Sequence, residues 1–171
     1  VPKFTDEEWA MISAPLDFYG VNIYRVGSGN PSRGEYGPDW YQGRPHTALN
    51  WSVTPECMYW APKFLYRRYG LPIMITENGM SEHDWVCLDG KVHDTYRIDF
   101  THRYLKQLSE TAEEIPIIGY MHWSVMDNYE WAEGYDERFG LIYVDYQTKE
   151  RTIKDSGEWY KTVIECNGEN L

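Results

Sequence analysis

Short apolar runs alternate with helix-like segments along most of the chain. Three runs are rich in β-branched and aromatic residues and too short for helices, which is typical of buried strands. These runs cover residues 16–24, 71–76 and 117–123. Apolar residues at helical spacing, together with helix-end signals, predict helices over residues 54–69, 94–114 and 156–165. Strands that alternate with helices in this order predict parallel βαβ units with both faces of the sheet covered.

A few residues set the expected ends of the first of these helices. Thr54-Pro55-Glu56 combines an N-cap residue, a proline for the first helical position and an acid for the first turn. Gly70 follows the last periodic residue and predicts the end of the helix. Pro62 lies inside the predicted helix and should bend it.

The segments between the predicted elements are long. Eight glycines and prolines between residues 25 and 50 predict one long loop, of the kind that is usually functional or mobile. A second loop, rich in Asp, Glu and Trp, is predicted at residues 124–138. Apolar residues at 139–144 and 151–153 then predict a hairpin before the last helix.

Length and composition predict a globular chain. Its 171 residues are 42% hydrophobic and 25% charged, and this length predicts one domain over residues 1–171. No run reaches the roughly 18 apolar residues that a transmembrane helix needs. Residues 1–17 contain four acids and no apolar stretch, so they do not resemble a signal peptide.

Charge and cysteine usage narrow the possible partners and compartment. The 27 acids and 16 bases give a net charge of −11, which disfavours a nucleic-acid partner. Cys57, Cys87 and Cys166 are few and far apart, which favours a reducing, cytoplasmic location over a disulfide framework. The five histidines lack metal-ligand spacing, and no phosphate-binding motif is present, so we expect no metal or cofactor.

Aromatic residues are unusually frequent, at 16% of the chain, with 15 Tyr and 8 Trp but only 5 Phe. Trp and Tyr combine a flat apolar face with a polar tip, and carbohydrate sites use such rings against sugars. Half-buried surface aromatics would give the same composition. Composition alone leaves both interpretations open.

Polar and aromatic residues cluster at the ends of the three predicted strands. Parallel strands would bring Asn22 and Tyr24, Glu77, and Trp123 to one rim. Glu77 follows an apolar run and would be partly buried, so it needs a partner, which Tyr24 could supply. It is a candidate nucleophile or general acid/base, although an acid that caps a loop or neutralises an arginine would fit the same pattern.

The loop after the third strand adds two further candidates. Trp131, with Trp123, suggests a platform for a sugar, and Glu130 suggests an acceptor for sugar hydroxyls. Core aromatics beside a solvated acidic loop would look the same. Together, a carboxylate, a tyrosine and two tryptophans at one rim favour a carbohydrate site.

Several segments resemble glycoside hydrolase family 1, the β-glucosidase family. Residues 17–24 resemble the sixth barrel strand of that family, and Ile75-Thr76-Glu77-Asn78-Gly79 resembles its I-T-E-N-G signature on strand seven. Residues 123–132 and 138–141 resemble its strand-eight segment. Further similar positions follow at Gly134-Tyr135, Tyr143-Val144-Asp145, Lys154-Asp155-Ser156 and Trp159-Tyr160. The resemblance implies an α/β fold, a partial (β/α)8 TIM barrel with its last three β/α units and a hairpin after strand eight.

The resemblance also implies roles for individual residues. Glu77 would be the nucleophile of a retaining β-glycosidase, and Tyr24 would orient it. Asn22, Trp123, Glu130, Trp131 and Phe139 would bind the sugar. The Glu130-Trp131 pair points to an unphosphorylated β-glucoside or oligosaccharide rather than a 6-phospho-sugar.

One part of the family pattern is missing. No Asn-Glu-Pro occurs in the sequence, so the T-x-N-E-P motif that carries the acid/base glutamate is absent. A complete barrel needs roughly 250 residues. We therefore expect an incomplete barrel with little turnover alone, which pairs with a chain carrying the first five strands or with itself. A non-catalytic carbohydrate-binding fragment and a pure interaction fragment are the alternatives.

Overall fold

The computed structural model describes residues 2–26, 29–30, 35–36, 43 and 45–171. Its elements in chain order are α1 (Asp6–Ile12), β1 (Tyr19–Asn22), β2 (Gly29–Asn30), β3 (Glu35–Tyr36), α2 (Cys57–Tyr69), β4 (Ile73–Asn78), α3 (Thr95–Ala112), β5 (Ile117–His122), the 3₁₀ turn η1 (Trp131–Glu133), β6 (Ile142–Val144), β7 (Arg151–Ile153) and α4 (Asp155–Glu165). No helix in these described ranges is both long and apolar enough to span a membrane.

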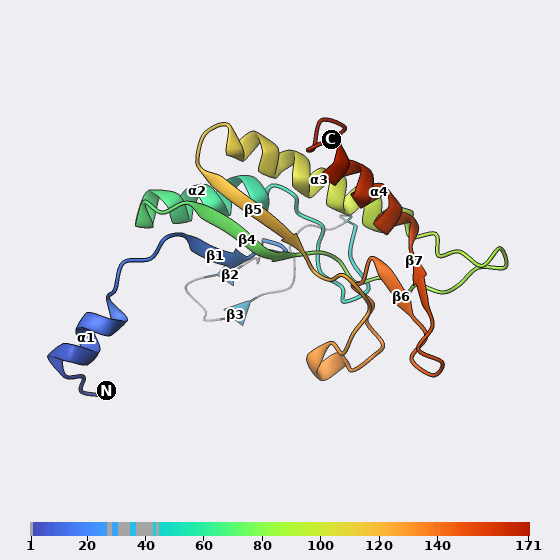
Figure 1. The fold of residues 1–171 in the computed structure, drawn as a ribbon, viewed down its shortest axis with the longest axis horizontal. Helices are drawn as coiled ribbons and strands as arrows, with labels where there is room; N and C mark the ends of the chain where they lie inside the picture. The colour runs from blue at the N-terminus through green and yellow to red at the C-terminus, as the bar shows by residue number, and fades with distance from the viewer. Residues whose placement is uncertain (1, 27–28, 31–34, 37–42, 44) are drawn as a thin grey trace.

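The three predicted strands form one parallel sheet in the order β1-β4-β5 (Figure 1). Tyr19 lies opposite Ile73, which in turn lies opposite Ile117. The register shifts near the carboxyl end of both strand pairs, and the β4-β5 pair has a further shift between Ile73 and Met74. The predicted βαβ arrangement is therefore confirmed, and the ends of all three strands lie at one edge of the sheet.

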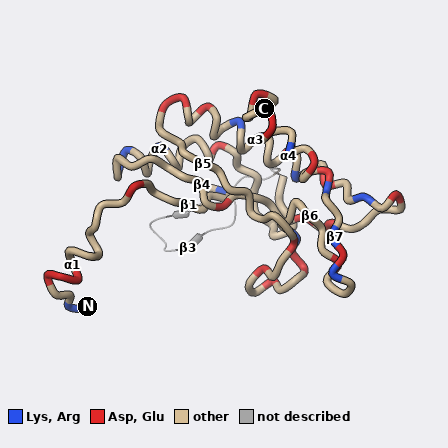
Figure 2. The backbone as a smooth tube through the Cα atoms, in the orientation of Figure 1, with Lys and Arg blue, Asp and Glu red and all other residues tan. Residues whose placement is uncertain are grey.

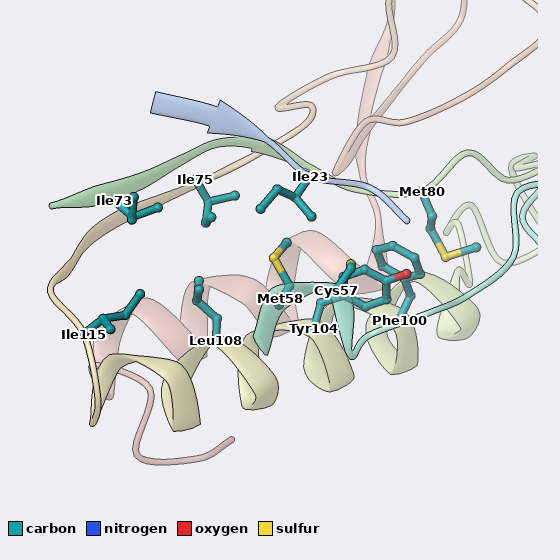
Figure 3. Packing of buried hydrophobic residues seen from close by; sticks show 10 residues of the cluster. All are labelled: Ile23, Cys57, Met58, Ile73, Ile75, Met80, Phe100, Tyr104, Leu108 and Ile115. Atoms are coloured by element: carbon teal, nitrogen blue, oxygen red, sulfur yellow. The ribbon is translucent and has the colours of Figure 1, made fainter. Parts of the chain in front are cut away.

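The main core lies between this sheet and the helices α2 and α3 (Figure 3). Ile73 and Ile75 of β4 face Met58 of α2 and Tyr104 of α3, and all four side chains are buried. The rings of Phe100 and Tyr104 stack with their centroids 3.9 Å apart. Burial of such side chains stabilises the fold by about 1.5–3 kcal/mol each.

The opposite face of the sheet is different, and the expectation that both faces are covered is wrong for the described residues. Gly20 and Asn22 of β1 lie on this face and are exposed. Thr76 of β4 lies beside them, because its Oγ1 donates a hydrogen bond to Asn22 Oδ1 at 2.7 Å. A Cβ atom at Gly20 would lie 3.1 Å from Thr76 Cγ2. The described chain thus places α2 and α3 on one face only.

Several element boundaries differ from the sequence-based expectation. Thr54 is not an N-cap, because α2 begins at Cys57 after a turn. The Thr54 hydroxyl instead accepts a hydrogen bond from Val26 N at 2.9 Å, and its own N–H donates to Tyr104 Oη at 2.8 Å. Pro62 lies within α2, and Gly70 ends the helix with a φ of 68°. Tertiary contacts at Thr54 outweigh its local capping preference.

The strands also differ in extent. β1 begins at Tyr19 rather than residue 16, since Leu16 and Phe18 are exposed. β4 covers residues 73–78 rather than 71–76, so Glu77 lies within the strand and not after it. The hairpin strand β6 begins at Ile142 rather than residue 139. The short strands β2 and β3 lie inside the predicted 25–50 loop, half of which is outside the described residues.

The N-terminal helix α1 was not predicted and lies apart from the sheet in Figure 1. Its capping box explains why it forms. Thr5 Oγ1 accepts a hydrogen bond from Glu8 N, and the Glu8 carboxylate accepts one from Thr5 N. None of its residues is buried. At the other end of the chain, α4 packs on α3.

Candidate active site

Glu77 lies near the carboxyl end of β4, the central strand of the sheet. Its side chain is half-buried, and Tyr24 Oη donates a hydrogen bond to Glu77 Oε2 at 2.8 Å. The main chains meet at the same place, since Ile23 N donates to Glu77 O at 3.0 Å. Burial and the adjacent Glu77 carboxylate raise the pKa of the Tyr24 phenol. Tyr24 therefore stays a hydrogen-bond donor to Glu77 at neutral pH.

Asn78 and Gly79, directly after Glu77, tie the three strands together at this edge. The buried Asn78 Nδ2 donates to Ile23 O at 2.9 Å, and Asn78 Oδ1 accepts from Tyr120 Oη at 2.8 Å. Asn78 O accepts from Trp123 N at 2.8 Å. A Cβ atom at position 79 would lie 1.8 Å from Trp123 O, so only glycine fits.

Trp123 and Glu130 continue the site beyond β5. Trp123 follows the strand directly, and its Nε1–H points to Glu130 Oε2 at 3.5 Å. Partial burial raises the pKa of the Glu130 carboxyl, and the negative charges of Glu77 and Glu137 raise it further, against the opposing effect of the Trp123 N–H. Glu130 thus lies within electrostatic reach of Glu77.

Three aromatic rings form one side of the site. Phe139, only 2% exposed, meets the ring of Tyr24 edge-on with centroids 6.3 Å apart. Trp51 contacts both rings, with centroids 5.4 Å from Tyr24 and 6.2 Å from Phe139. The guanidinium of Arg25 lies 5.5 Å from the centre of the Trp51 ring.

Asn22 and Trp131 lie at the margins of this group. Asn22 is opposite Glu77 in the strand register and points to the open face, where Thr76 binds its side chain. Trp131 begins η1 with a φ of 43°, and its side chain is 79% exposed. The structure therefore brings together Tyr24, Glu77, Trp123, Glu130 and Phe139, with Asn22 on the adjacent strand and the Trp131 ring in solvent.

Comparison with known proteins identifies the family of this chain. The model of glycosyl hydrolase family 1 matches residues 1–169. The chain belongs to glycosyl hydrolase family 1. It is β-glucosidase-like, because its relatives include a 1,4-beta-D-glucan glucohydrolase of Thermotoga neapolitana (39% identical) and Beta-glucosidase A of Thermotoga maritima (40% identical).

The similarity to solved family 1 structures is equally close. The family 1 β-glucosidase from Thermotoga maritima superposes on this chain with a TM-score of 0.86 at 39% identity, covering 95% of this chain and 38% of that chain. A structure of that enzyme in complex with deoxynojirimycin superposes with a TM-score of 0.86, covering 95% of this chain and 37% of that chain. The α/β arrangement of this chain therefore matches part of a family 1 TIM barrel.

The chain spans only part of its family relatives. The two Thermotoga matches take in 98% of this chain but 39% of the length of each relative.

The site contains two features that the sequence pattern did not reveal. Trp51 follows the glycine-rich loop and carried no motif of its own, although it packs against both Tyr24 and Phe139. Asn78-Gly79 belongs to the I-T-E-N-G segment, but the sequence did not predict that it joins β1, β4 and the end of β5. The aromatic excess of the chain was the one available signal for Trp51.

The loop between β5 and β6 makes this end of the molecule acidic (Figure 2). Residues 127–138 contain five acids and one base. Glu137 is 9% exposed, and its Oε2 has no hydrogen-bond partner in the structure. The site region therefore carries carboxylate acceptors in excess of the donors that the described side chains offer them.

Proposed function

We propose that this chain is the nucleophile-bearing part of a retaining β-glycosidase of the β-glucosidase type, and that it corresponds to the last three β/α units of the barrel. The hydrogen bond from Tyr24 to Glu77 at 2.8 Å carries this proposal. It holds a half-buried carboxylate in one orientation at the strand ends, where such folds bind ligands. Family membership and the β-glucosidase relatives support the same assignment.

In this mechanism Glu77 attacks the anomeric carbon of a β-glucoside. A bond forms between a Glu77 oxygen and that carbon while the bond to the leaving-group oxygen breaks, and that oxygen takes up a proton. Water then attacks the glycosyl ester, releases the sugar and restores the Glu77 carboxylate. Tyr24 keeps the attacking carboxylate oriented, and its own raised pKa prevents it from ionising in competition.

The sugar would lie against Trp123 and next to Glu130. Glu130 would accept hydrogen bonds from sugar hydroxyls, with Trp131 extending the subsite from its exposed position. Asn22 and Phe139 would line the site beside the nucleophile. The pair Glu130-Trp131 favours an unphosphorylated glycoside, and the acidic charge of the surrounding loop would repel a phosphate.

The motifs of this chain do not provide the carboxyl group that protonates the leaving group, so another source has to supply it. A retaining site needs two carboxyl groups about 5–5.5 Å apart, and the sequence lacks the family's acid/base motif. A complementary chain with the first five strands would supply it and would cover the open face at Gly20 and Asn22. Self-association through the outer strands β1 and β5 is the alternative. General acid catalysis contributes typically about 10²–10⁴-fold, so the lone chain would turn over poorly.

Covalent trapping tests this proposal without an acid catalyst. The chain is incubated with a 2-deoxy-2-fluoro-β-glucoside that carries an activated leaving group, and its intact mass and peptide map are measured. We expect a gain of one fluoroglucosyl group on Glu77. The gain should vanish in Glu77→Gln and persist in Glu110→Gln, a control on the exposed surface of α3. Sugar binding that survives Glu77→Gln, without any adduct in the unmodified chain, would instead establish a non-catalytic binding module.

A further inference from the structure

We infer that Arg138 is a positioning residue, which holds the loop of residues 128–137 and thereby fixes Glu130 at the sugar. This inference rests on the proposed function, because it concerns the subsite that Glu130 forms there. It adds a role for a side chain that touches neither Glu77 nor Glu130 in the structure.

Arg138 closes the base of this loop. Its Nη1 donates a hydrogen bond to Asp127 Oδ2 at 2.7 Å and another to Val144 O at 3.0 Å. Asp127 and Arg138 directly flank residues 128–137, so the ion pair joins the two ends of the loop. Asp127 is a firm anchor, because its side chain is fully buried and also accepts from Gly140 N at 2.9 Å and Lys154 Nζ at 2.8 Å.

The guanidinium also packs against aromatic rings that lead, through tilted and edge-on ring contacts, into the loop. It lies 4.2 Å from the ring centre of Tyr143 and 4.7 Å from that of Tyr146. Tyr146 in turn packs against Tyr135, with centroids 4.6 Å apart, and Tyr135 packs against Tyr129 at 5.4 Å. Tyr129 immediately precedes Glu130. A chain of ring contacts therefore runs from Arg138 to the residue beside the sugar-binding carboxylate.

The main chain of Arg138 is fixed to the nucleophile side of the site. Its carbonyl accepts hydrogen bonds from Arg97 Nη2 at 2.8 Å and from Glu82 N at 3.1 Å. Glu82 lies five residues after Glu77 in the chain. The next residue, Phe139, packs on Tyr24. Arg138 thus links the Glu130 loop to the β4 segment that carries the nucleophile.

Arginine suits this position better than lysine. The planar guanidinium offers several fixed donors and two faces for stacking, whereas a lysine ammonium would keep the ion pair but lose the stack. We therefore expect Arg138→Lys to retain part of the function and Arg138→Gln to lose it.

The test measures how the rate of covalent trapping depends on the concentration of the fluoroglucoside. Arg138→Gln should raise the half-saturating concentration by about tenfold, the effect of losing one good polar contact to the sugar. The limiting rate should stay within about twofold, because Glu77 and Tyr24 lie on other elements. Arg103→Gln is the matched control, since Arg103 forms an exposed ion pair with Asp99 on α3, and it should change neither quantity.

A double-mutant cycle separates positioning from general structural damage. If Arg138 acts through Glu130, the half-saturating concentration of Arg138→Gln/Glu130→Gln should equal that of Glu130→Gln alone. Additive losses would overturn the inference, and so would an unchanged half-saturating concentration in Arg138→Gln.

Misfolding of the variant and absence of trapping in the unmodified chain have different consequences. Should Arg138→Gln fail to fold, as judged by circular dichroism, Tyr146→Leu removes the stack and leaves the Asp127 pair, and it should raise the half-saturating concentration in the same direction. An unchanged value there refutes the inference. Absence of trapping in the unmodified chain would refute the proposed function itself, a result distinct from failure of the positioning role.

Discussion

Two groups of charged residues near the strand ends differ in how their charges are satisfied. In the buried ion cluster (Asp84, Asp94, Arg97, Asp127 and Lys154), each carboxylate is paired with at least one cation. In the candidate site, the described residues offer Glu77 and Glu130 one aromatic side-chain donor each, and they offer Glu137 Oε2 none. The buried cluster satisfies its charges within the fold, whereas the half-buried Glu77 and Glu130 keep acceptor capacity for a ligand. Unmet hydrogen-bonding capacity, rather than charge alone, therefore distinguishes the carboxylates of the candidate site from those of the ion cluster.

Removing a cation from the buried cluster should have the largest effect on stability. Arg97 is fully buried between Asp84 and Asp94, so Arg97→Met would leave the buried Asp94 without a cation and Asp84 with Lys154 alone. We expect a loss of about 3–5 kcal/mol in the free energy of unfolding, measured by urea denaturation. Arg103→Met removes an exposed pair on the same helix and should cost about 1 kcal/mol or less. Equal losses in both variants would contradict the distinction between the two groups.

Removing a hydrogen-bond donor from the candidate site should instead slow trapping and leave stability almost unchanged. Tyr24→Phe deletes the hydrogen bond to Glu77 but keeps the ring that packs against Trp51 and Phe139. A hydrogen bond to a charged group contributes about 1.5–3 kcal/mol, so trapping by the fluoroglucoside should slow by roughly 10–100-fold. The melting temperature should change little, and Tyr19→Phe at the start of β1 provides a control for the loss of a hydroxyl. A large drop in melting temperature with unchanged trapping would make Tyr24 a structural residue.

The pH dependence of stability at His122 tests the effect of the cations in the ion cluster. Burial, together with the positive charges of Arg97 and Lys154, lowers its pKa to about 3. Because the folded pKa is below the unfolded value of about 6.5, the stabilising contribution is complete above pH 6.5 and declines as pH falls toward 3. A single proton gives a slope of about 1.4 kcal/mol per pH unit. Between pH 6 and 4, His122→Leu should remove this contribution from the slope of the free energy of unfolding against pH, measured by urea denaturation. An unchanged slope would contradict the lowered pKa of His122.

The sequence predicted the sheet and the contact between Tyr24 and Glu77 because local patterns encode both. Strand periodicity placed Tyr24 and Glu77 on neighbouring strand ends, and the family motifs named the same residues. The contacts of Trp51 and Arg138 could not be predicted, because they depend on how distant loops pack. Thr54 shows the same limit, since its strong local capping signal gave way to contacts with Val26 and Tyr104. The exposure of the sheet face at Gly20 and Asn22 likewise depends on tertiary contacts, which local sequence patterns do not encode.

The smallest predicted effect concerns an exposed histidine that lies between two aspartates. His93 Nδ1 lies 2.6 Å from Asp155 Oδ2, and its Nε2 lies 3.0 Å from Asp89 Oδ2. Both ring nitrogens can donate to these carboxylates only when the ring is protonated, and these hydrogen bonds raise the pKa of His93. The raised folded pKa means that this contribution is complete below about pH 6.5 and is lost as pH rises through the folded value.

We therefore expect His93→Gln to lower the melting temperature slightly at pH 5.5, with the difference from the unmodified chain disappearing at pH 9. Asp89→Asn should show the same pH dependence, because it removes one of the two acceptors. His83→Gln, an exposed histidine in the same loop, is the control and should leave the pH profile unchanged. A difference that grows toward pH 9 would have the wrong sign and would contradict a protonated His93 that donates to both aspartates. The two aspartates would then lack a cationic partner, like the carboxylates of the candidate site and unlike those of the buried ion cluster.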